Sequence, residues 1–223
     1  MIVTLDGPAG AGKSSAAKAL ARRLGFDFLD TGAMYRAVTL AALRSGIDLQ
    51  DQQALARLLD DFHVEMPPGR ALLNGEDVTS AIRTMAVTNG SGAIANSPVV
   101  RRHLVGLQRA IAQGRNMVCE GRDQGTIVFP DAICKFFVVA DPTERARRRQ
   151  GEMARRGEVQ PLDEVLRAQD ERDRRDAARD IAPMVPAADA ITLDSTRLTL
   201  EQVVERMEQE ARRRMKGDLE RRT

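Results

Sequence analysis

A glycine-rich segment near the N-terminus, GPAGAGKS at residues 7–14, narrows the possible folds sharply. It matches the pattern G-x-x-x-x-G-K-[ST] of a phosphate-binding loop. Residues 2–6 before it are apolar and partly β-branched, and residues 14–24 after it have apolar positions at helical spacing. A strand that leads through such a loop into a helix favours an α/β fold in which backbone N–H groups enclose a phosphate.

We expect this loop to bind the triphosphate of ATP together with Mg²⁺. Its glycines let backbone N–H groups curl around phosphate oxygens, Lys13 reaches the β- and γ-phosphates, and the Ser14 hydroxyl is a magnesium ligand. The residues expected to bind ATP are Gly7, Pro8, Ala9, Gly10, Ala11, Gly12, Lys13, Ser14 and Ser15. The loop alone does not identify the reaction, because GTPases, motor ATPases and small-molecule kinases all use it.

Apolar runs that alternate with helical patterns predict a doubly wound α/β domain. Further strands are expected at residues 26–29, 116–120, 133–140 and 190–193, so that five parallel strands carry helices on both faces of the sheet. Residues 62–85 hold short strand-like pieces separated by turn residues such as Asn74-Gly75, which predict a small antiparallel insert.

We expect one P-loop kinase domain over residues 1–223. Its core is expected at about 1–30, 98–148 and 166–223, its monophosphate-binding region at about 31–97 with the insert at 62–85, and its lid at about 149–165.

The charge balance disfavours several classes of partner. The chain has 34 Lys and Arg against 32 Asp and Glu, and this net charge of +2 argues against a protein that coats nucleic acid or a membrane surface. No apolar run approaches the ~18 residues of a membrane span, and no basic leader with an apolar signal region begins the chain. Cys119 and Cys134 lie in apolar runs, which favours buried thiols and a cytoplasmic location.

Arginines are concentrated in one polar stretch. Between Asp141 and Asp180 there are eleven Arg, eleven acidic residues and no Lys. A solvated, ion-paired helix accounts for any single one of them, but together they predict a lid that neutralises a transferring phosphoryl group and excludes water. Arg148, in the cluster at 145–149, is a candidate catalytic residue.

Two loops are expected at the edge of the sheet where ligands bind. Glu120-Gly121-Arg122-Asp123 follows a buried strand, and Asp30-Thr31-Gly32 follows another. A cation at this edge can hold an acceptor phosphate, and a carboxylate can accept a hydrogen bond from an exocyclic amine.

These segments together resemble the bacterial cytidylate kinases, which belong to the nucleoside monophosphate kinases. The resemblance rests on LDGPAGAGKSS (5–15), LDTGAMYRA (29–37), GEDVTSAIRT (75–84), EGRDQGTIVFPDA (120–132), ERDRRDAARDIAPMVPAADA (171–190) and LDST (193–196). It implies transfer of the ATP γ-phosphate to CMP or dCMP by a monomer that binds neither nucleic acid nor a membrane.

The resemblance also implies residue roles by position. Arg101 and Asp123 would read the cytosine edge, Arg172 and Asp176 would hold the ribose hydroxyls, and Arg36, Arg122 and Arg179 would bind the acceptor phosphate. The implied CMP-binding set is Thr31, Arg36, Gly92, Arg101, Arg122, Asp123, Arg172, Asp176 and Arg179, and the implied catalytic set is Lys13, Arg122, Arg148 and Arg179. Gly92 stands where many relatives have a base-contacting Ser, which leaves three alternatives: the hydrogen bond to the base is missing, water replaces it, or Ser91 supplies it. Glu120 stands where some relatives have Asp.

Two alternatives remain open at this point. The chain could be another P-loop kinase that acts on UMP or on a non-nucleotide acceptor. It could also be an ATP-dependent nucleic-acid-binding switch that uses the basic tail at 212–222, although a terminal amphipathic helix is the simpler interpretation of that tail. Phosphorylation of a panel of acceptors and salt-dependent nucleic-acid binding would separate these classes.

Overall fold

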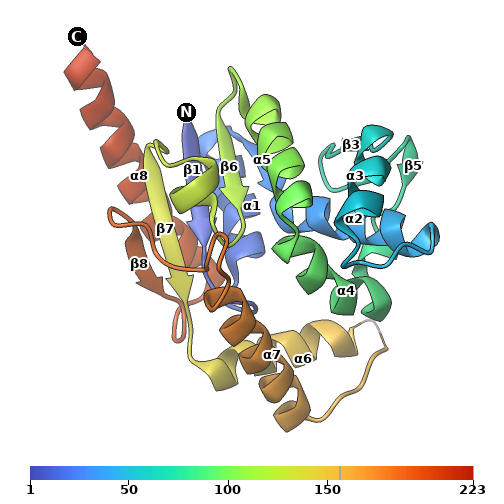
Figure 1. Cartoon of the computed structure of the whole chain (residues 1–223). Coiled ribbons are helices and arrows are strands. Elements are labelled where there is room, and N and C mark those ends of the chain that lie inside the picture. The colour runs from blue at the N-terminus through green and yellow to red at the C-terminus, as the bar shows by residue number, and fades with distance from the viewer. Residues whose placement is uncertain (156, 223) are drawn as a thin grey trace. The chain divides into compact units, whose positions relative to one another are not determined.

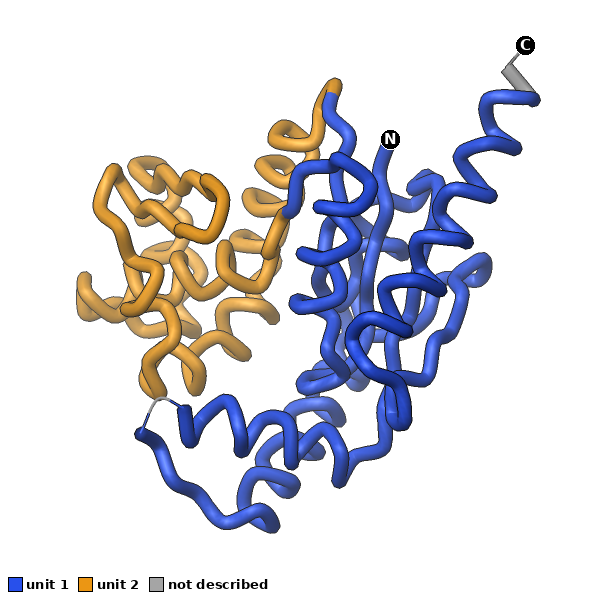
Figure 2. Tube along the Cα trace, turned by 180° about the vertical axis from the view of Figure 1, so that it is seen from behind, with its two compact units in different colours: residues 1–28, 115–223 blue, residues 29–114 orange. Residues whose placement is uncertain are grey.

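The computed structural model (Figure 1) describes residues 1–155 and 157–222. Two compact units make up the chain, one from residues 1–28 and 115–223 and the other from residues 29–114 (Figure 2). The first unit contains the P-loop, and residue 156 of the expected lid lies outside the described residues. The division of the chain into core, monophosphate-binding region and lid stays a prediction.

The five-stranded parallel sheet that the sequence predicted is confirmed, and its strand order is β2-β6-β1-β7-β8. Figure 1 labels four of its strands, β6, β1, β7 and β8. The strands are β1 (Ile2–Asp6), β2 (Asp27–Asp30), β6 (Met117–Glu120), β7 (Cys134–Val139) and β8 (Ile191–Asp194). The first strand pairs in parallel with both β6 and β7. Because parallel strands end at the same edge, the P-loop after β1 and the loop after β6 emerge together.

The helices of the first unit are α1 (Lys13–Leu24), α6 (Pro142–Ala154), α7 (Leu162–Ala177) and α8 (Leu200–Arg222). Helices α1 and α8 bury Leu20, Val204 and Met207 against the sheet residues Leu5 and Phe136. Helix α7 ends at Ala177, and α8 continues to Arg222. None of the described helices combines the length and the apolar character that a membrane span requires.

The second unit is helical with a small sheet. Its helices are α2 (Thr31–Arg44), α3 (Gln52–Asp60), α4 (Met85–Asn96) and α5 (Pro98–Ala112), with a 3-10 turn at Ala81–Arg83. The antiparallel insert is confirmed as β3 (Val64–Glu65), β4 (Leu72–Leu73) and β5 (Glu76–Asp77). Asn74 and Gly75 both have positive φ, 49° and 84°, as a tight hairpin turn requires.

Helix α4 was not predicted, because its sequence MAVTNGSGAIAN is rich in poor helix formers. Tertiary packing supports it instead. A Cβ on Gly90 would lie 2.8 Å from Leu49 Cδ1 and 3.0 Å from Thr39 Cγ2. The glycine that weakens the intrinsic helix propensity therefore lets α4 approach its neighbours within the unit.

Candidate active site

The phosphate-binding loop joins β1 to α1 as the sequence predicted. Gly7, Gly10 and Gly12 have φ values of 133°, 76° and 87°, a region that residues with a Cβ rarely adopt. Gly12 is the N-cap of α1 and no side chain caps this end of the helix. The backbone N–H groups of the first helical turn are therefore suited to bind an anion.

Lys13 begins α1 and is 5% exposed. Its Nζ donates a hydrogen bond across the loop to the Pro8 carbonyl oxygen at 2.6 Å. Burial, together with the positive charge of Arg122, lowers the pKa of Lys13 to about 7. An incoming polyphosphate favours the charged form, because a nearby negative charge raises the pKa of an ammonium group.

A serine and a glutamate provide hard oxygen donors beside the loop. The Ser14 hydroxyl donates to Glu120 Oε1 at 2.8 Å, and Glu120 is 7% exposed. This pair fits Mg²⁺, which in nucleotide sites takes one or two protein ligands and completes its shell with water and phosphate oxygens. Within residues 1–155 and 157–222, no group of three or more His, Cys, Asp or Glu is arranged to hold a metal without substrate.

The loop after β6 is attached to β1 through Asp6, a residue that the sequence reasoning missed. Its carboxylate accepts the backbone N–H groups of Gln124 at 2.9 Å and Gly125 at 2.8 Å. Burial raises the pKa of Asp6 to about 6, although the two N–H groups oppose the shift. The only sequence signal was a carboxylate at the end of an apolar strand, directly before the P-loop.

Asp176 brings three of the predicted arginines together. Arg122 Nε donates to Asp176 Oδ2 at 3.0 Å, Arg179 forms an ion pair with Asp176 Oδ1, and Arg172 Nε lies 4.0 Å from Oδ2. The Asp176 side chain is 5% exposed. Three guanidinium groups around one carboxylate leave an excess of positive charge, which suits a phosphate. Arg179 reaches this cluster from beyond Ala177, the last residue of α7.

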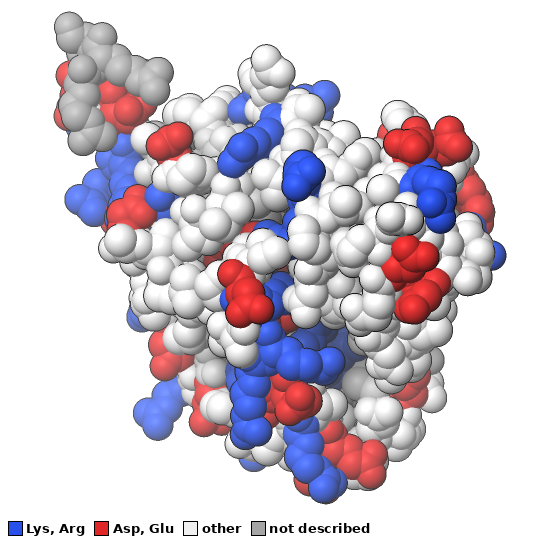
Figure 3. All heavy atoms as spheres, in the orientation of Figure 1, with Lys and Arg blue, Asp and Glu red and all other residues white. Residues whose placement is uncertain are grey.

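Helices α6 and α7 contact the outer part of the P-loop. Arg145 Nη1 donates to the Ala9 carbonyl oxygen at 3.1 Å and forms an ion pair with Asp173, whose Oδ1 accepts the Ala9 N–H at 3.1 Å. A Cβ on Gly10 would lie 2.7 Å from the buried amide nitrogen of Gln169. Basic and acidic side chains gather over these two helices in Figure 3. The arginine-rich segment is thus attached to the phosphate loop.

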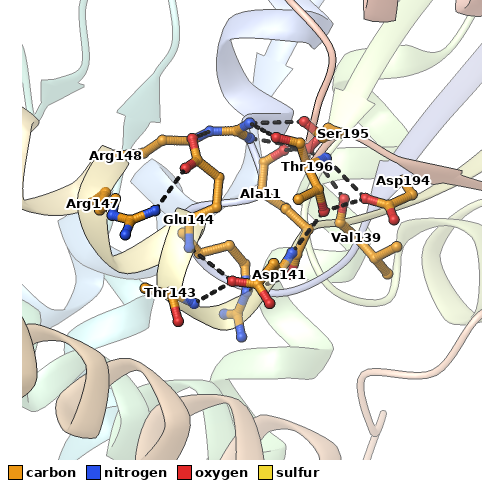
Figure 4. Close-up of polar contacts among 12 residues, drawn as sticks. Ala11, Val139, Asp141, Thr143, Glu144, Arg147, Arg148, Asp194, Ser195 and Thr196 are labelled. Carbon is orange, nitrogen blue, oxygen red and sulfur yellow. Dashed lines mark hydrogen bonds and ion pairs between the residues drawn. The ribbon is translucent and has the colours of Figure 1, made fainter.

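Arg148, a predicted catalytic residue, lies beside the P-loop (Figure 4). Its Nε donates to Glu144 Oε1 at 3.0 Å, its Nη1 to Ser195 Oγ at 3.1 Å and its Nη2 to the Ser195 carbonyl oxygen at 2.7 Å. A Cβ on Gly12 would lie 3.8 Å from Arg148 Nη1. The guanidinium group is therefore held close to the start of α1.

The predicted residues of the second unit lie on three of its helices. Arg36 Nη1 on α2 donates to the Ile82 carbonyl oxygen at 3.1 Å and to Thr88 Oγ1 at 2.9 Å. Arg101 on α5 is 5% exposed, and its guanidinium carbon lies 5.9 Å from the centroid of the Tyr35 ring. Both arginines are therefore held by other residues of their own unit.

The other two predicted residues of this unit, Thr31 and Gly92, lie on helices α2 and α4. Thr31 is the first residue of α2 and is 2% exposed. Gly92 lies within α4. The neighbouring Ser91 donates its hydroxyl to the Thr88 carbonyl oxygen at 2.9 Å, so this hydroxyl is engaged within its own helix.

Comparison with known proteins adds a match along nearly the whole chain. The family model described as cytidylate kinase matches residues 3–213. A cytidylate kinase of Pelotomaculum thermopropionicum is 48% identical over 207 residues, which cover 91% of this chain and 92% of the relative. A cytidylate kinase of Solibacter usitatus is 49% identical over 207 residues, with 92% and 89% covered. A solved structure of an uncharacterized protein from Eubacterium ventriosum has a TM-score of 0.50 at 11% identity, covers 95% of this chain and 98% of that chain, and supports the fold alone.

Proposed function

The chain belongs to the cytidylate kinase family, and from this premise we propose how its residues transfer the γ-phosphoryl group of ATP to CMP or dCMP. It is a phosphotransferase whose acceptor is itself a phosphate group. The structural observation that best supports this function is the arginine cluster around Asp176, which lies in the same unit as the P-loop.

On the donor side, we propose that residues 7–15 bind ATP. Backbone N–H groups of the loop and of the first turn of α1 enclose the phosphates, and Lys13 neutralises the β- and γ-phosphates. Ser14, with Glu120 beside it, holds Mg²⁺. When bound, the ion neutralises charge on the phosphate oxygens.

On the acceptor side, we propose a role for each of nine residues. Arg36, Arg122 and Arg179 bind the phosphate of CMP, Arg101 and Asp123 recognise the cytosine, and Arg172 and Asp176 bind the ribose. Thr31 and Gly92 complete this set. Because Gly92 offers no side-chain hydroxyl, one neutral hydrogen bond to the base is lost, at a cost of about 0.5–1.5 kcal/mol.

The chemistry requires no general base. The second pKa of a phosphate monoester is about 6, so the acceptor oxygen is already ionised at neutral pH. Catalysis then consists of alignment and of neutralising the charge on the transferring group. We assign that neutralisation to Lys13, Arg122, Arg148 and Arg179, all in the first unit.

We further propose that the chain acts in the cytoplasm as a single-domain monomer that binds nucleotides with Mg²⁺ and binds neither nucleic acid nor a membrane. The basic tail gives little support to a nucleic-acid-binding switch, because three of its arginines, Arg212, Arg213 and Arg214, are paired with acidic residues. Arg212 lies 2.8 Å from Glu208, and Glu210 lies 2.6 Å from Arg213 and 3.0 Å from Arg214.

An acceptor panel tests the proposed activity directly. ADP release with ATP and Mg²⁺ is measured for CMP, dCMP, UMP, AMP and shikimate at equal concentrations. We expect CMP and dCMP to be the preferred acceptors. Equal rates with UMP, or turnover of shikimate alone, would assign the site to another acceptor class.

Replacing Asp123 by alanine is expected to lower kcat/KM for CMP by about 10- to 100-fold, the range for a lost hydrogen bond to a charged group. The Kd for ATP is expected to change less than twofold, because the P-loop is untouched. The exposed Asp131 in the same connection supplies the control variant Asp131→Ala, which should behave as wild type. Unchanged CMP kinetics in Asp123→Ala would remove Asp123 from the base-binding set.

A further inference from the structure

The LDST segment at 193–196 has no role in the proposed function. Its Ser195 nevertheless lies where the P-loop, strand β7 and helix α6 meet (Figure 4). Ser195 follows β8 and is 2% exposed. Its Oγ lies 2.9 Å from the carbonyl oxygen of Ala11 and 3.1 Å from that of Val139. The same oxygen accepts a hydrogen bond from Arg148 Nη1 at 3.1 Å. One hydroxyl thus contacts the P-loop, the end of β7 and helix α6.

The hydroxyl has one proton, so it donates to one carbonyl at a time. The shorter contact is to Ala11, which is 1% exposed and whose carbonyl oxygen therefore depends on a protein partner. The backbone of Ser195 is itself fixed, because its N–H donates to the Val139 carbonyl oxygen at 2.8 Å. The position of the hydroxyl is therefore determined by the sheet.

We propose that Ser195 is a positioning residue, whose hydroxyl fixes the guanidinium group of Arg148 relative to the phosphate-binding loop. Arg148 donates to the hydroxyl, and the hydroxyl donates to the Ala11 carbonyl oxygen. The catalytic cation and the phosphate-binding loop are therefore both hydrogen-bonded to the same side chain. The inference rests on the proposed role of Arg148 in phosphoryl transfer. Small displacements of a catalytic group are costly, since about 1 Å can lower a rate up to 100-fold.

The first test is Ser195→Ala, assayed at saturating ATP and CMP. The contact from Arg148 to the Ser195 carbonyl oxygen survives this change, so we expect a partial loss of kcat, about tenfold. The KM for CMP should change less than twofold. Ser195→Cys keeps a side chain of similar size but bonds weakly, and it should lower kcat similarly with an unchanged melting temperature.

Thr196 supplies a matched control one residue away. Its hydroxyl accepts a hydrogen bond from the Asp141 N–H at 2.9 Å and donates one to Asp194 Oδ1. These bonds support the start of α6 and not the P-loop. Thr196→Val should therefore keep kcat within twofold of wild type. An equal loss of kcat in Thr196→Val and Ser195→Ala would overturn the inference, because the effect would then belong to the segment and not to the hydroxyl.

A double-mutant cycle with Arg148→Met separates the inference from the proposed function. Arg148→Met alone should lower kcat about 100-fold. In that background Ser195→Ala should lower kcat by less than a further twofold, because no guanidinium remains to be positioned. A wild-type kcat in Arg148→Met would refute the proposed role of Arg148. A large loss in Arg148→Met with full additivity of Ser195→Ala, or with no effect of Ser195→Ala alone, would refute only the positioning role.

Discussion

Replacing Lys13 by methionine is expected to lower kcat by about 1,000-fold while the protein stays folded. Lys13 is the cation at the start of α1, and its Nζ reaches across the loop to the Pro8 carbonyl oxygen at 2.6 Å. Methionine fills a similar volume but neutralises no charge on the phosphoryl group. The loss should therefore appear in kcat at saturating substrates.

The stability of the Lys13→Met variant relative to wild type should depend on pH. Burial lowers the pKa of Lys13 from 10.5 to about 7 in the folded protein. Between these values the unfolded chain binds more protons, so the wild-type contribution of Lys13 to folding becomes less favourable as the pH falls towards 7. Methionine removes this penalty, and the variant should gain stability relative to wild type as the pH falls from 10 to 7.

The control for this prediction is Lys18→Met, on the same helix but exposed. It should keep kcat within twofold of wild type. Steady-state ADP release measures activity, and urea unfolding at pH 7 and at pH 9.5 measures stability. A Lys13→Met enzyme with more than a tenth of the wild-type kcat would remove Lys13 from the catalytic set.

Gly7→Ala is expected to lower the free energy of unfolding by at least about 3–4 kcal/mol. A Cβ on Gly7 would lie 2.1 Å from the Val138 carbonyl oxygen and 3.1 Å from the Val138 carbonyl carbon. These atoms belong to β7, which pairs with β1 through Leu5–Phe136 and Asp6–Phe137. Neither strand can move away without breaking that pairing, so the clash persists.

Gly25→Ala provides the matched control. Gly25 ends α1 with φ 69°, also in the left-handed region, but a Cβ there would meet no atom within 4 Å. Gly25→Ala should lower the free energy of unfolding by about 1 kcal/mol, the cost of holding a residue with a Cβ in the left-handed region. Both variants place an alanine at positive φ, but only Gly7→Ala also brings a Cβ against Val138. Comparing their urea unfolding therefore separates the backbone strain from the steric clash. Equal losses in the two variants would show that the contact with β7 is unimportant.

Much of this fold follows from local patterns. The P-loop, the short apolar strands and the Asn74-Gly75 turn are each contained within a few residues, so periodicity and turn chemistry identify them. The five-stranded sheet follows because strands that alternate with helices pair in parallel. Helix α4 escaped prediction because its glycines disfavour a helix and become useful only where Gly90 meets Leu49 and Thr39.

The residues of the candidate site also divide into those that the sequence identified and those that only the structure revealed. Lys13, Ser14, Arg122 and Asp176 could be named from motif and resemblance, because each occupies a recognisable position in a short segment. Asp6, Asp173 and Ser195 could not, because their partners Gln124, Ala9 and Ala11 lie 118, 164 and 184 residues away in the chain. No local pattern records contacts of that length.

By itself, then, the amino-acid sequence determined the class of this chain: a parallel α/β kinase with a phosphate loop and an excess of arginine near it. Only the tertiary structure decided how that loop is supported. Asp6 binds the backbone of the loop that carries Arg122. The backbone of Ala9 is hydrogen-bonded to Arg145 and Asp173. Ser195 forms hydrogen bonds to both Ala11 and Arg148. The physical reason is that phosphate binding needs a backbone conformation that glycines permit locally, whereas holding that conformation rigid requires hydrogen bonds from strands and helices distant in the chain.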